Sequence, residues 1–448
     1  MDNLDRFKVS KYNEYLGQIE SRFVIFNNMT TGMVEVSREV NESLQSNDTR
    51  FLRNLNPNSA LVKGGFVVPD ELDETANLLS VRKDAEKYGM AIGLQILPTL
   101  NCNFACPYCY ENVPEESAMM SREIMDAILG HVRQISTDKT ESLVVSWFGG
   151  EPLLAMSQMQ YLSERFLEFA EKKGLFYAAN LVTNGYNMGT RVVSRLQKWH
   201  VTQVQVTLDG PREVHDQRRF LRSGAPTYEK ILRNIRIAAD AGMKITVRVN
   251  LDKTNIHSLK ALLLDLEKRN LLGVVKISLS PVNNDGVACG VTESSLLESS
   301  DIIEQTQKKD IYCLMALQDK TDFRRLYPNV LGCVAESPSG LIITPDGTLY
   351  KCSKVIGDPD WACGNITSFD GGHPNFRRFV DASRYEIPQC KLCRLLPVCP
   401  ISECVYQQVV LGEERAGCAF TDRHKTHHDS LIKIYKNARN EPCRTSNL

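Results

Sequence analysis

The sequence predicts an α/β protein whose main body is a parallel sheet, with a small domain before it and a cysteine-rich region after it. Between about residues 91 and 300, short apolar runs typical of strands alternate with segments of helical periodicity, which is the pattern of a parallel sheet. The chain of 448 residues is too long for one ordinary domain. Nine of the fourteen cysteines lie from Cys333 onward, where regular periodicity fades.

Composition and charge exclude several classes of protein. Hydrophobic residues make up 42% of the chain and charged residues 24%, and the formal net charge is −1. These values are typical of a globular protein without a basic surface for nucleic acid. The first residues lack the apolar core of a signal peptide, and no run of about 18 apolar residues predicts a membrane span. We therefore expect a cytoplasmic protein with no membrane or nucleic-acid partner, whose cysteines bind metal rather than form disulfides.

Residues 1–88 are expected to form a first domain. The runs at 23–28 and 33–38 are typical of strands, and the MTTG sequence between them predicts the turn of a hairpin. Gly64 and Gly65 predict a bend within residues 61–68. A helix is predicted over 71–89, because its acidic residues come early, its basic residues come late and Gly89 can end it.

Residues 89–309 are expected to form the parallel-sheet domain. Helices are predicted from Ser121, through Met159 to Gly174, from Thr190, from Thr227 and from Asn255. In such a sheet, loops at the carboxyl ends of the strands assemble the functional site. The six predicted strands are Ile92–Leu97, Leu143–Phe148, Tyr177–Val182, Val204–Leu208, Lys244–Asn250 and Val275–Ser280.

A cysteine loop follows the first of these strands. Within Leu97–Glu111, the residues Cys102, Cys106 and Cys109 have C-x3-C-x2-C spacing. Three thiolates on one short loop can hold three irons of a cubane [4Fe–4S] cluster and leave the fourth iron open to a small molecule. An electron-transfer cluster has four cysteine ligands, and a zinc site needs a second pair of ligands nearby. The spacing therefore predicts a reactive cluster.

The sequence CNFACPYC, with Tyr108 directly before the third cysteine, resembles the cluster loop of radical S-adenosylmethionine (SAM) enzymes. The later motifs occur in the order of that family. The resemblance implies a partial (β/α)6 TIM-like barrel for the six strand–helix units. It also implies that SAM is cleaved to a 5′-deoxyadenosyl radical, which abstracts hydrogen from an unactivated position of the substrate.

The resemblance assigns the SAM pocket to motifs at the strand ends. GGEP, after the second strand, resembles the family's motif for the methionine amino group, and its carboxylate and carbonyls can accept hydrogen bonds from an ammonium group. Polar residues that end the third to fifth strands are expected to contact the ribose and carboxylate, for which Arg248 is a natural partner. The expected SAM-binding residues are Tyr108, Gly149, Gly150, Glu151, Pro152, Asn184, Thr207 and Arg248.

Residues 310–448 resemble a SPASM domain, the auxiliary-cluster extension of peptide-modifying radical SAM enzymes. The spacing departs from the family in one interval, because four residues separate Cys399 from Cys404 where three are usual. The resemblance implies two auxiliary [4Fe–4S] clusters, and thus three clusters in all. One would be bound by Cys390, Cys393, Cys399 and Cys418, and the other by Cys333, Cys352 and Cys404.

The second auxiliary cluster lacks a nearby fourth cysteine in the sequence. The stretch FRRLYPNVLG before Cys333 contains none, so we consider Cys313, Cys363 or a thiolate of the substrate as the fourth ligand. Structural zinc is the alternative for the whole region, because C-x2-C pairs favour it. Cys289 and Cys443 have no partner at ligand spacing and are left unassigned.

The combined motifs resemble radical SAM maturases of ribosomally made peptides (RiPPs). The first domain resembles, weakly, the winged-helix peptide-recognition domain of such enzymes, and a cap that only shields the barrel is the alternative. The resemblance implies a precursor peptide with a leader segment, an intramolecular thioether or carbon–carbon crosslink, and an electron donor such as flavodoxin or ferredoxin. We expect the leader to bind by strand addition.

Two other functions remain as alternatives. One is an anaerobic sulfatase maturase, which oxidises a Cys or Ser side chain to formylglycine. That family has a catalytic Asp directly after the cysteine equivalent to Cys352, and this chain has Ser353. The other is a non-catalytic iron–sulfur electron carrier, which the three-cysteine loop and the GGEP motif argue against.

Two charged segments remain to be interpreted. The histidine-rich segment Asp422–Asp429 is interpreted as a solvated helix face. The arginines Arg218, Arg219 and Arg222 are expected either to meet an acidic peptide or to face water.

Overall fold

The computed structural model describes residues 7–88, 90–109, 119–282, 293–297, 299–317, 333–382, 388–399, 405–410, 412 and 423–438. The chain forms two compact units. The first comprises Met1–Lys87, Asp322–Glu336 and Val380–Pro442, and the second comprises Tyr88–Thr321, Ser337–Phe379 and Cys443–Leu448. The predicted cysteine-rich region 310–448 is therefore divided between the two units, and the three-domain division remains a prediction.

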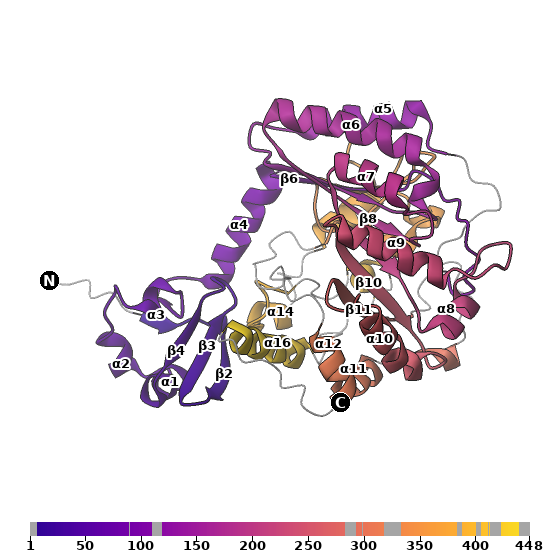
Figure 1. Cartoon of the computed structure of the whole chain (residues 1–448). Coiled ribbons are helices and arrows are strands. Elements are labelled where there is room, and N and C mark those ends of the chain that lie inside the picture. Colours follow the sequence, from indigo (N-terminus) through magenta and orange to yellow (C-terminus); the bar gives the residue numbers. More distant parts are fainter. Residues whose placement is uncertain are drawn as a thin grey trace. The chain divides into compact units, whose positions relative to one another are not determined.

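The second unit is built on an eight-stranded sheet with the strand order β11-β10-β9-β8-β7-β6-β12-β13 (Figure 1). Neighbouring strands from β6 to β11 pair in parallel, which confirms the predicted α/β architecture. Each strand agrees with its prediction to within one or two residues, except that β9 begins three residues earlier. The six strands are β6 (Ala91–Ile96), β7 (Ser142–Trp147), β8 (Phe176–Thr183), β9 (Val201–Thr207), β10 (Lys244–Leu251) and β11 (Val275–Pro281).

Amphipathic helices connect these strands. Helix α6 packs on β7 and β8, α7 packs on β9, and α9 packs on β10. Helix α6 ends at Gly174, whose φ of 68° is the left-handed conformation that favours glycine at a helix end. Helices α10, α11 and α12 lie side by side (Figure 1). The bounds are α5 (Arg122–Ile135), α6 (Met156–Lys173), α7 (Thr190–Lys198), α8 (Arg212–Arg218), α9 (Tyr228–Asp240), α10 (Leu259–Lys268), α11 (Ser299–Gln307) and α12 (Lys309–Ala316).

The sheet continues beyond β6 into residues that follow the helical layer in sequence. Strand β12 (Gly340–Ile343) pairs in parallel with β6, and β13 (Leu349–Tyr350) pairs antiparallel with β12. All four residues of β12 are buried, which explains its continuously apolar sequence GLII. Strand β6, which leads into the cysteine loop, is therefore paired on both sides. Helix α13 (Pro374–Asp381) and the short helix η5 (Ser353–Val355) follow β13.

The first unit contains a three-stranded antiparallel sheet with the order β2-β3-β4. The predicted hairpin corresponds to β3 and β4, and the predicted bend at Gly64 and Gly65 separates α3 from β5. The apolar core includes Ile25, Leu44 and Phe66. The elements are β1 (Phe7–Val9), β2 (Asn13–Ile19), β3 (Arg22–Asn27), β4 (Met33–Val36), α1 (Arg38–Gln45), α2 (Thr49–Arg53), α3 (Ala60–Lys63), β5 (Val67–Pro69), α4 (Glu74–Tyr88), α14 (Pro388–Leu392) and α15 (Val405–Val409).

The histidine-rich segment does not form a solvated face, so that interpretation was wrong. It lies in α16 (Arg423–Ala438), which packs beside β2 (Figure 1). His427 contacts Asn28 through Nε2 and Oδ1 at 2.7 Å, and His428 contacts the buried carboxylate of Glu14 at 2.9 Å. The histidines share one face of α16 with apolar residues at positions 431 and 435, because residues three and four apart lie together on a helix.

Candidate active site at the carboxyl ends of the strands

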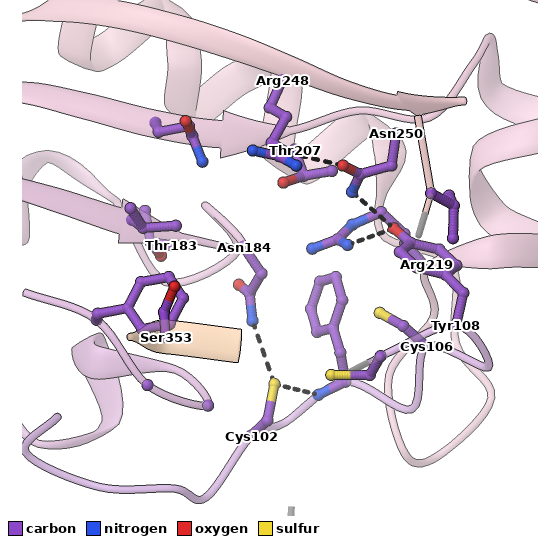
Figure 2. A pocket seen from close by; sticks show the side chains of 18 of the residues that line it. Cys102, Cys106, Tyr108, Thr183, Asn184, Thr207, Arg219, Arg248, Asn250 and Ser353 are labelled. Carbon is purple, nitrogen blue, oxygen red and sulfur yellow. Dashed lines mark hydrogen bonds between the residues drawn. The ribbon is translucent and has the colours of Figure 1, made fainter. Parts of the chain in front are cut away.

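A cavity of about 340 Å³ opens at the carboxyl ends of the parallel strands, within the second unit (Figure 2). Its wall is formed by the cysteine loop, the loop after β7, the ends of β8 to β11, and η5. This is the edge of a parallel barrel at which active sites form. The lining residues are Cys102, Phe104, Cys106, Tyr108, Cys109, Phe148, Gly149, Gly150, Val182, Thr183, Asn184, Gln205, Thr207, Arg219, Arg248, Asn250, Pro281, Val282, Ser353 and Lys354.

The three cysteines of the loop all line this cavity. The backbone N–H of Phe104 donates to the Cys102 sulfur at 3.4 Å, and the backbone of Cys109 turns back on Cys106 with a 3.1 Å hydrogen bond. Burial raises the pKa of the Cys102 thiol to about 12. Burial also raises the pKa of the Cys106 thiol, and attraction to Arg219 is the main influence that opposes this shift. Binding of iron by these thiols would therefore release protons.

The arrangement of the donors fits a cluster better than a single metal ion. Among the described residues, no three His, Cys, Asp or Glu side chains come together around one point where a metal ion could bind. Three thiols spaced on one loop around a cavity instead suit a cubane, in which each thiolate binds its own iron. Hydrogen bonding to the Cys102 sulfur is a further feature typical of cluster ligands.

The two glycines of GGEP bring the loop after β7 against the cysteine loop. Gly149 has a φ of 112°, a conformation that residues with a side chain rarely adopt. A Cβ atom on Gly150 would lie only 2.3 Å from the carbonyl oxygen of Leu100 and 2.6 Å from that of Asn101. Next to this contact, the N–H of Glu151 donates to the Asn101 carbonyl at 2.8 Å. The glycine pair thus packs closely against the backbone of the residues that precede Cys102, and we call this contact the glycine seat.

The Glu151 side chain turns away from the cavity wall. Its carboxylate is fully buried and accepts hydrogen bonds from the Thr183 hydroxyl and the Asn184 backbone N–H, both at 2.7 Å. It also accepts from the Leu153 N–H at 3.0 Å. Burial raises the pKa of Glu151, and these hydrogen bonds oppose the shift. Glu151 therefore ties the end of β8 to the GGEP loop, and Pro152, which is also buried, begins the short helix η1 (Pro152–Leu154) behind it.

Asn184, Thr207 and Arg248 line the cavity at or near the carboxyl ends of three successive strands. The Asn184 amide donates to Asn103 at 2.8 Å and lies 3.9 Å from the Cys102 sulfur (Figure 2). The Arg248 guanidinium is held in place, because Nε donates to Asn250 at 2.7 Å and Nη2 donates to the Ser280 hydroxyl at 2.8 Å. The structure thus brings together Tyr108, Gly149, Gly150, Asn184, Thr207 and Arg248 around one cavity and places Glu151 and Pro152 behind it.

Tyr108 is held by charged groups at its hydroxyl. The hydroxyl donates to the buried carboxylate of Asp209 and accepts from Nη1 of Arg219 at 2.7 Å. Burial raises the pKa of both Tyr108 and Asp209. Arg218 pairs with Asp209 and Asp252. Arg218 and Arg219 are therefore engaged by groups of the fold itself, so the interpretation that they face water was wrong for these two residues. Contact of these arginines with an acidic peptide stays a prediction.

Several lining residues were missed in the sequence. Gln205 lies two residues before Thr207 on β9, so the period-two alternation of a strand places both on the same face. Pro281 and Val282 end the sixth strand, where the same strand-end rule applies. Arg219 had no such signal, because its position depends on how the chain folds back after α8.

Ser353 lines the cavity beside the cysteine loop and GGEP, directly after Cys352 in sequence (Figure 2). Its segment is anchored by the preceding Lys351, which is fully buried and donates to the carbonyls of Ser337 and Gly340 at 2.6 Å. The position at which sulfatase maturases have an acid therefore belongs to the cavity wall of this chain and carries a hydroxyl.

The cysteines expected to bind auxiliary clusters lie in both units. The structure describes Cys333, Cys390, Cys393 and Cys399 in the first unit and Cys352 in the second. Among the candidates for the fourth ligand, Cys313 lies on α12, and Cys363 is buried with its thiol donating to the Trp361 carbonyl at 3.6 Å. Burial raises the pKa of Cys363 to about 11. Outside the described residues lie Cys289, Cys404, Cys418 and Cys443, so the two ligand sets remain predictions.

Comparison with known proteins finds a family match within the sheet domain. Residues 96–266 match the model of the radical SAM superfamily. The Fe-coproporphyrin III synthase of Methanosarcina barkeri is 26% identical over 174 residues, which cover 38% of this chain and 40% of that protein. The cysteine-type anaerobic sulfatase-maturating enzyme of Clostridium novyi is 22% identical over 330 residues, which cover 67% of this chain and 84% of that protein. The first four curated relatives are matched over only 35% to 56% of their lengths.

Two solved structures share the fold over most of the chain. A structure of anSMEcpe with bound AdoMet superposes with a TM-score of 0.60 at 16% identity and covers 79% of this chain and 97% of that one. Streptococcus suis SuiB bound to its precursor peptide SuiA superposes with a TM-score of 0.51 at 14% identity, covering 91% of this chain and 97% of that one. These likenesses confirm the partial barrel expected from the sequence.

Proposed function

We propose, from the premise that residues 96–266 are a radical SAM domain, that this chain is a radical SAM maturase of a ribosomally made precursor peptide. Its product would be an intramolecular crosslink, either a thioether or a carbon–carbon bond. The observation that carries the proposal is the cavity, in which three thiols of one loop meet the strand-end polar residues.

No helix among the described residues is long and apolar enough to span a membrane.

The residues of the cavity fit the two groups that this chemistry needs. Cys102, Cys106 and Cys109 would hold a [4Fe–4S] cluster with one open iron. When bound, the cluster and SAM together supply a 5′-deoxyadenosyl radical that takes a hydrogen atom from the substrate. The residues proposed to hold SAM are Tyr108, Gly149, Gly150, Asn184, Thr207 and Arg248, with Glu151 and Pro152 supporting the GGEP loop from behind.

The protein contributes placement and shielding to the reaction. The Gly149–Gly150 seat sets the distance between the cysteine loop and the loop after β7, because nothing larger than hydrogen fits at Gly150. Arg248 is fixed by Asn250 and Ser280, so its remaining N–H groups present a preset direction to a carboxylate. The apolar wall formed by Phe148, Val182 and Val282 excludes water from a reactive carbon radical.

The auxiliary clusters belong to the same proposal. We keep the two ligand sets expected from the sequence, with the second cluster completed by Cys313, Cys363 or a substrate thiolate. The buried Cys363 thiol, which is bonded to a backbone carbonyl, would have to turn away from Trp361 to bind iron. That requirement favours the substrate thiolate, which would place the residue to be crosslinked on the cluster.

The first unit is proposed to bind the leader segment of the precursor. Its sheet β2-β3-β4 has two edges, and α16 packs beside β2. Within the described part of the chain, β4 pairs only with β3, so a leader strand could add along β4. The solved SuiB structure with its precursor peptide SuiA shares this overall fold. The electron donor is proposed to be a flavodoxin or ferredoxin.

A sulfatase maturase is the second candidate, favoured by the match to the enzyme from Clostridium novyi. The cavity argues against it. Ser353 occupies the position at which that family has an acid, and a serine hydroxyl is far too weak a base to replace a carboxylate at neutral pH. The first unit, with its own peptide-sized sheet edge, is a further feature that a formylglycine-forming enzyme does not require.

The proposal is tested with anaerobically reconstituted protein, SAM and dithionite. We expect iron-dependent release of 5′-deoxyadenosine, and its absence from a Cys102→Ala variant. A precursor encoded next to the gene should then lose two hydrogen atoms per crosslink, measured by mass spectrometry. Formylglycine in a sulfatase-derived peptide would support the second candidate, and protein without any SAM cleavage would refute radical chemistry altogether.

A further inference from the structure

A second segment of the chain pairs with the cysteine loop through backbone hydrogen bonds, and we call this segment the strap. Residues 219–222, which follow α8, run antiparallel to residues 102–105, with Phe104 bridged to Leu221. The Ala105 N–H donates to the Phe220 carbonyl at 3.0 Å, and the Arg222 N–H donates to the Asn103 carbonyl at 2.9 Å. Arg222 also donates through Nε to the Cys102 carbonyl at 2.8 Å. The position of the three thiols thus depends on residues up to 120 positions later in the chain.

Two successive arginines where α8 meets this strap have different surroundings. Arg218 is neutralised, since its guanidinium pairs with Asp252 at 2.8 Å and lies 3.7 Å from Asp209. Arg219 points to the cavity wall, donates to the Tyr108 hydroxyl at 2.7 Å and stacks over Phe104 at 5.6 Å (Figure 2). Arg219 therefore has no carboxylate as a direct hydrogen-bond partner among the described residues.

The Arg219 guanidinium keeps an unused hydrogen-bond donor inside the protein. Its Nε atom is shielded from solvent and has no partner among the described residues. A buried charged group usually has all its donors satisfied, because leaving one unsatisfied costs its full desolvation penalty. An unpaired donor on a cation that lines a cavity indicates that an anionic group belongs there. The three neighbouring thiols become anionic only when they bind metal.

We propose that Arg219 is a positioning residue that fixes the cysteine loop through Tyr108 and places its positive charge on the cluster bound there. This inference rests on the proposed function, because it assumes a [4Fe–4S] cluster on Cys102, Cys106 and Cys109. The fixed charge favours the reduced cluster over the oxidised one, since reduction adds one negative charge to the cluster. Arg219 thereby helps the cluster to accept the electron that SAM cleavage requires.

The electron balance of this step is simple. A one-electron donor, dithionite in the test below, is oxidised, and the cluster gains one electron without gaining a proton. A fixed cation that lines the same cavity as the three thiols stabilises that extra charge by Coulomb attraction. After screening we expect about a tenfold effect on the reduced fraction at a fixed potential, equal to about 59 mV for one electron.

The test compares Arg219→Gln and Arg219→Lys with Arg222→Gln as the matched control. Arg222 is exposed and bonds to the same loop, but it does not line the cavity, so Arg222→Gln removes a strap contact and a solvent-screened charge while leaving the charge on the cavity wall. Each full-length protein is reconstituted anaerobically. Iron per chain, thermal unfolding and a redox titration followed by electron paramagnetic resonance are then measured.

We expect Arg219→Gln to shift the midpoint potential to more negative values at unchanged iron content, whereas Arg219→Lys and Arg222→Gln stay near the wild type. Loss of the cluster in Arg219→Gln with retention in Arg219→Lys would also support the proposal, since lysine keeps the charge. An unchanged potential in Arg219→Gln, or loss of the cluster in all three variants, would overturn it. Wild-type protein that binds no cluster would instead refute the proposed function.

Discussion

At Gly150 the loop after β7 touches the backbone that leads into the cysteine loop. The sequence GGEP was interpreted as a ligand-binding motif, and the structure adds a packing reason for its second glycine. Any side chain at this position would collide with two carbonyl oxygens, and backbone atoms cannot give way as the tip of a flexible side chain can. The glycine is therefore required by the position of Cys102, whether or not SAM is bound.

Replacing Gly150 with alanine should displace the cysteine loop. The added methyl group would lie 2.3 Å from the Leu100 carbonyl oxygen, and we expect a loss of stability of about 1–3 kcal/mol. The iron content after reconstitution should fall with it. The matched control is Gly93→Ala on β6, where an added Cβ would meet no atom within 4 Å. Equal iron content in the two variants would contradict this account of the glycine seat.

His215, on α8, gives the stability of the protein a pH dependence. Its Nδ1 accepts from the Asp209 N–H at 3.3 Å, which leaves Nε2 to donate to the Thr227 hydroxyl at 3.1 Å. Burial, together with repulsion from Arg219 and Arg218, lowers the pKa of His215 well below its usual value. The folded protein therefore takes up this proton less readily than the unfolded chain. Stability from this group is present above the ordinary histidine pKa of about 6.5 and is lost as pH falls below it.

Lowering the pH should therefore reduce the free energy of unfolding through His215. Between about pH 6.5 and pH 5, the wild type should lose up to about 1.4 kcal/mol of unfolding free energy per pH unit from this residue. A His215→Gln variant should be less stable at pH 7.5 but show a flatter profile. Denaturant unfolding of both proteins at a series of pH values measures the difference. Parallel profiles would show that His215 takes up its proton at the same pH in the folded and unfolded states.

Residue types and spacings predicted which cysteines and glycines meet at the site, because these motifs are continuous in the chain. They did not predict where Glu151 points. Its partners Thr183 and Asn184 lie on the next strand, and their hydrogen bonds turn the carboxylate inward. Arg219 was missed for the same reason, since its role depends on a fold-back contact with the loop at Phe104.

At the scale of elements, helix α16 shows how a polar sequence can hide a packed face. The segment reads as charged and histidine-rich, yet Leu431 is fully buried and packs with Leu16, Val24 and Phe26. Strands of the central sheet were predicted more accurately, because apolar residues recur at every second position along them and are buried there. Strand β2 was missed, since Gly17 and Gln18 interrupt its alternation.

Shortening Leu431 should destabilise the first unit. Leu431→Ala removes a fully buried side chain from the contact between α16 and the sheet, so we expect a loss of about 2–5 kcal/mol. Hydrogen exchange of β2 and β3 should become faster. The control is Lys436→Ala, an exposed residue on the same helix. If β2 and β3 exchange at the same rate in both variants, α16 does not support this sheet.

At the scale of the whole molecule, the alternation of strands and helices was enough to predict the barrel, but not where its sheet ends. Two strands that follow the helices of the barrel, β12 and β13, extend the sheet at β6. No local signal in GLII specifies this partner, because any exposed parallel edge accepts an apolar strand. The predicted boundary at 309/310 therefore separates residues that the fold joins in one unit.

Fragments of the chain should show that the barrel depends on its pairing with β12. A fragment of residues 88–336 would lack β12. The edge of β6 that pairs with β12 in the full chain would then have unpaired backbone groups, so we expect this fragment to aggregate. A fragment of residues 88–379 retains β12 and should remain monomeric. Size-exclusion chromatography with light scattering distinguishes the two. A monomeric 88–336 fragment would show that β12 is dispensable for the barrel.

The pairing of β12 with β6 also limits how such proteins can exchange parts in evolution or by design. A crossover at residue 309 would place a foreign strand on β6 and a foreign residue at Ser353 in the cavity wall. Crossover after residue 379 would leave both in their native context. Recombination that changes the cysteine-rich part while keeping the chemistry of the barrel should thus succeed at the later point, and chimaeras joined at the earlier one should inherit a mismatched sheet together with an altered substrate cavity.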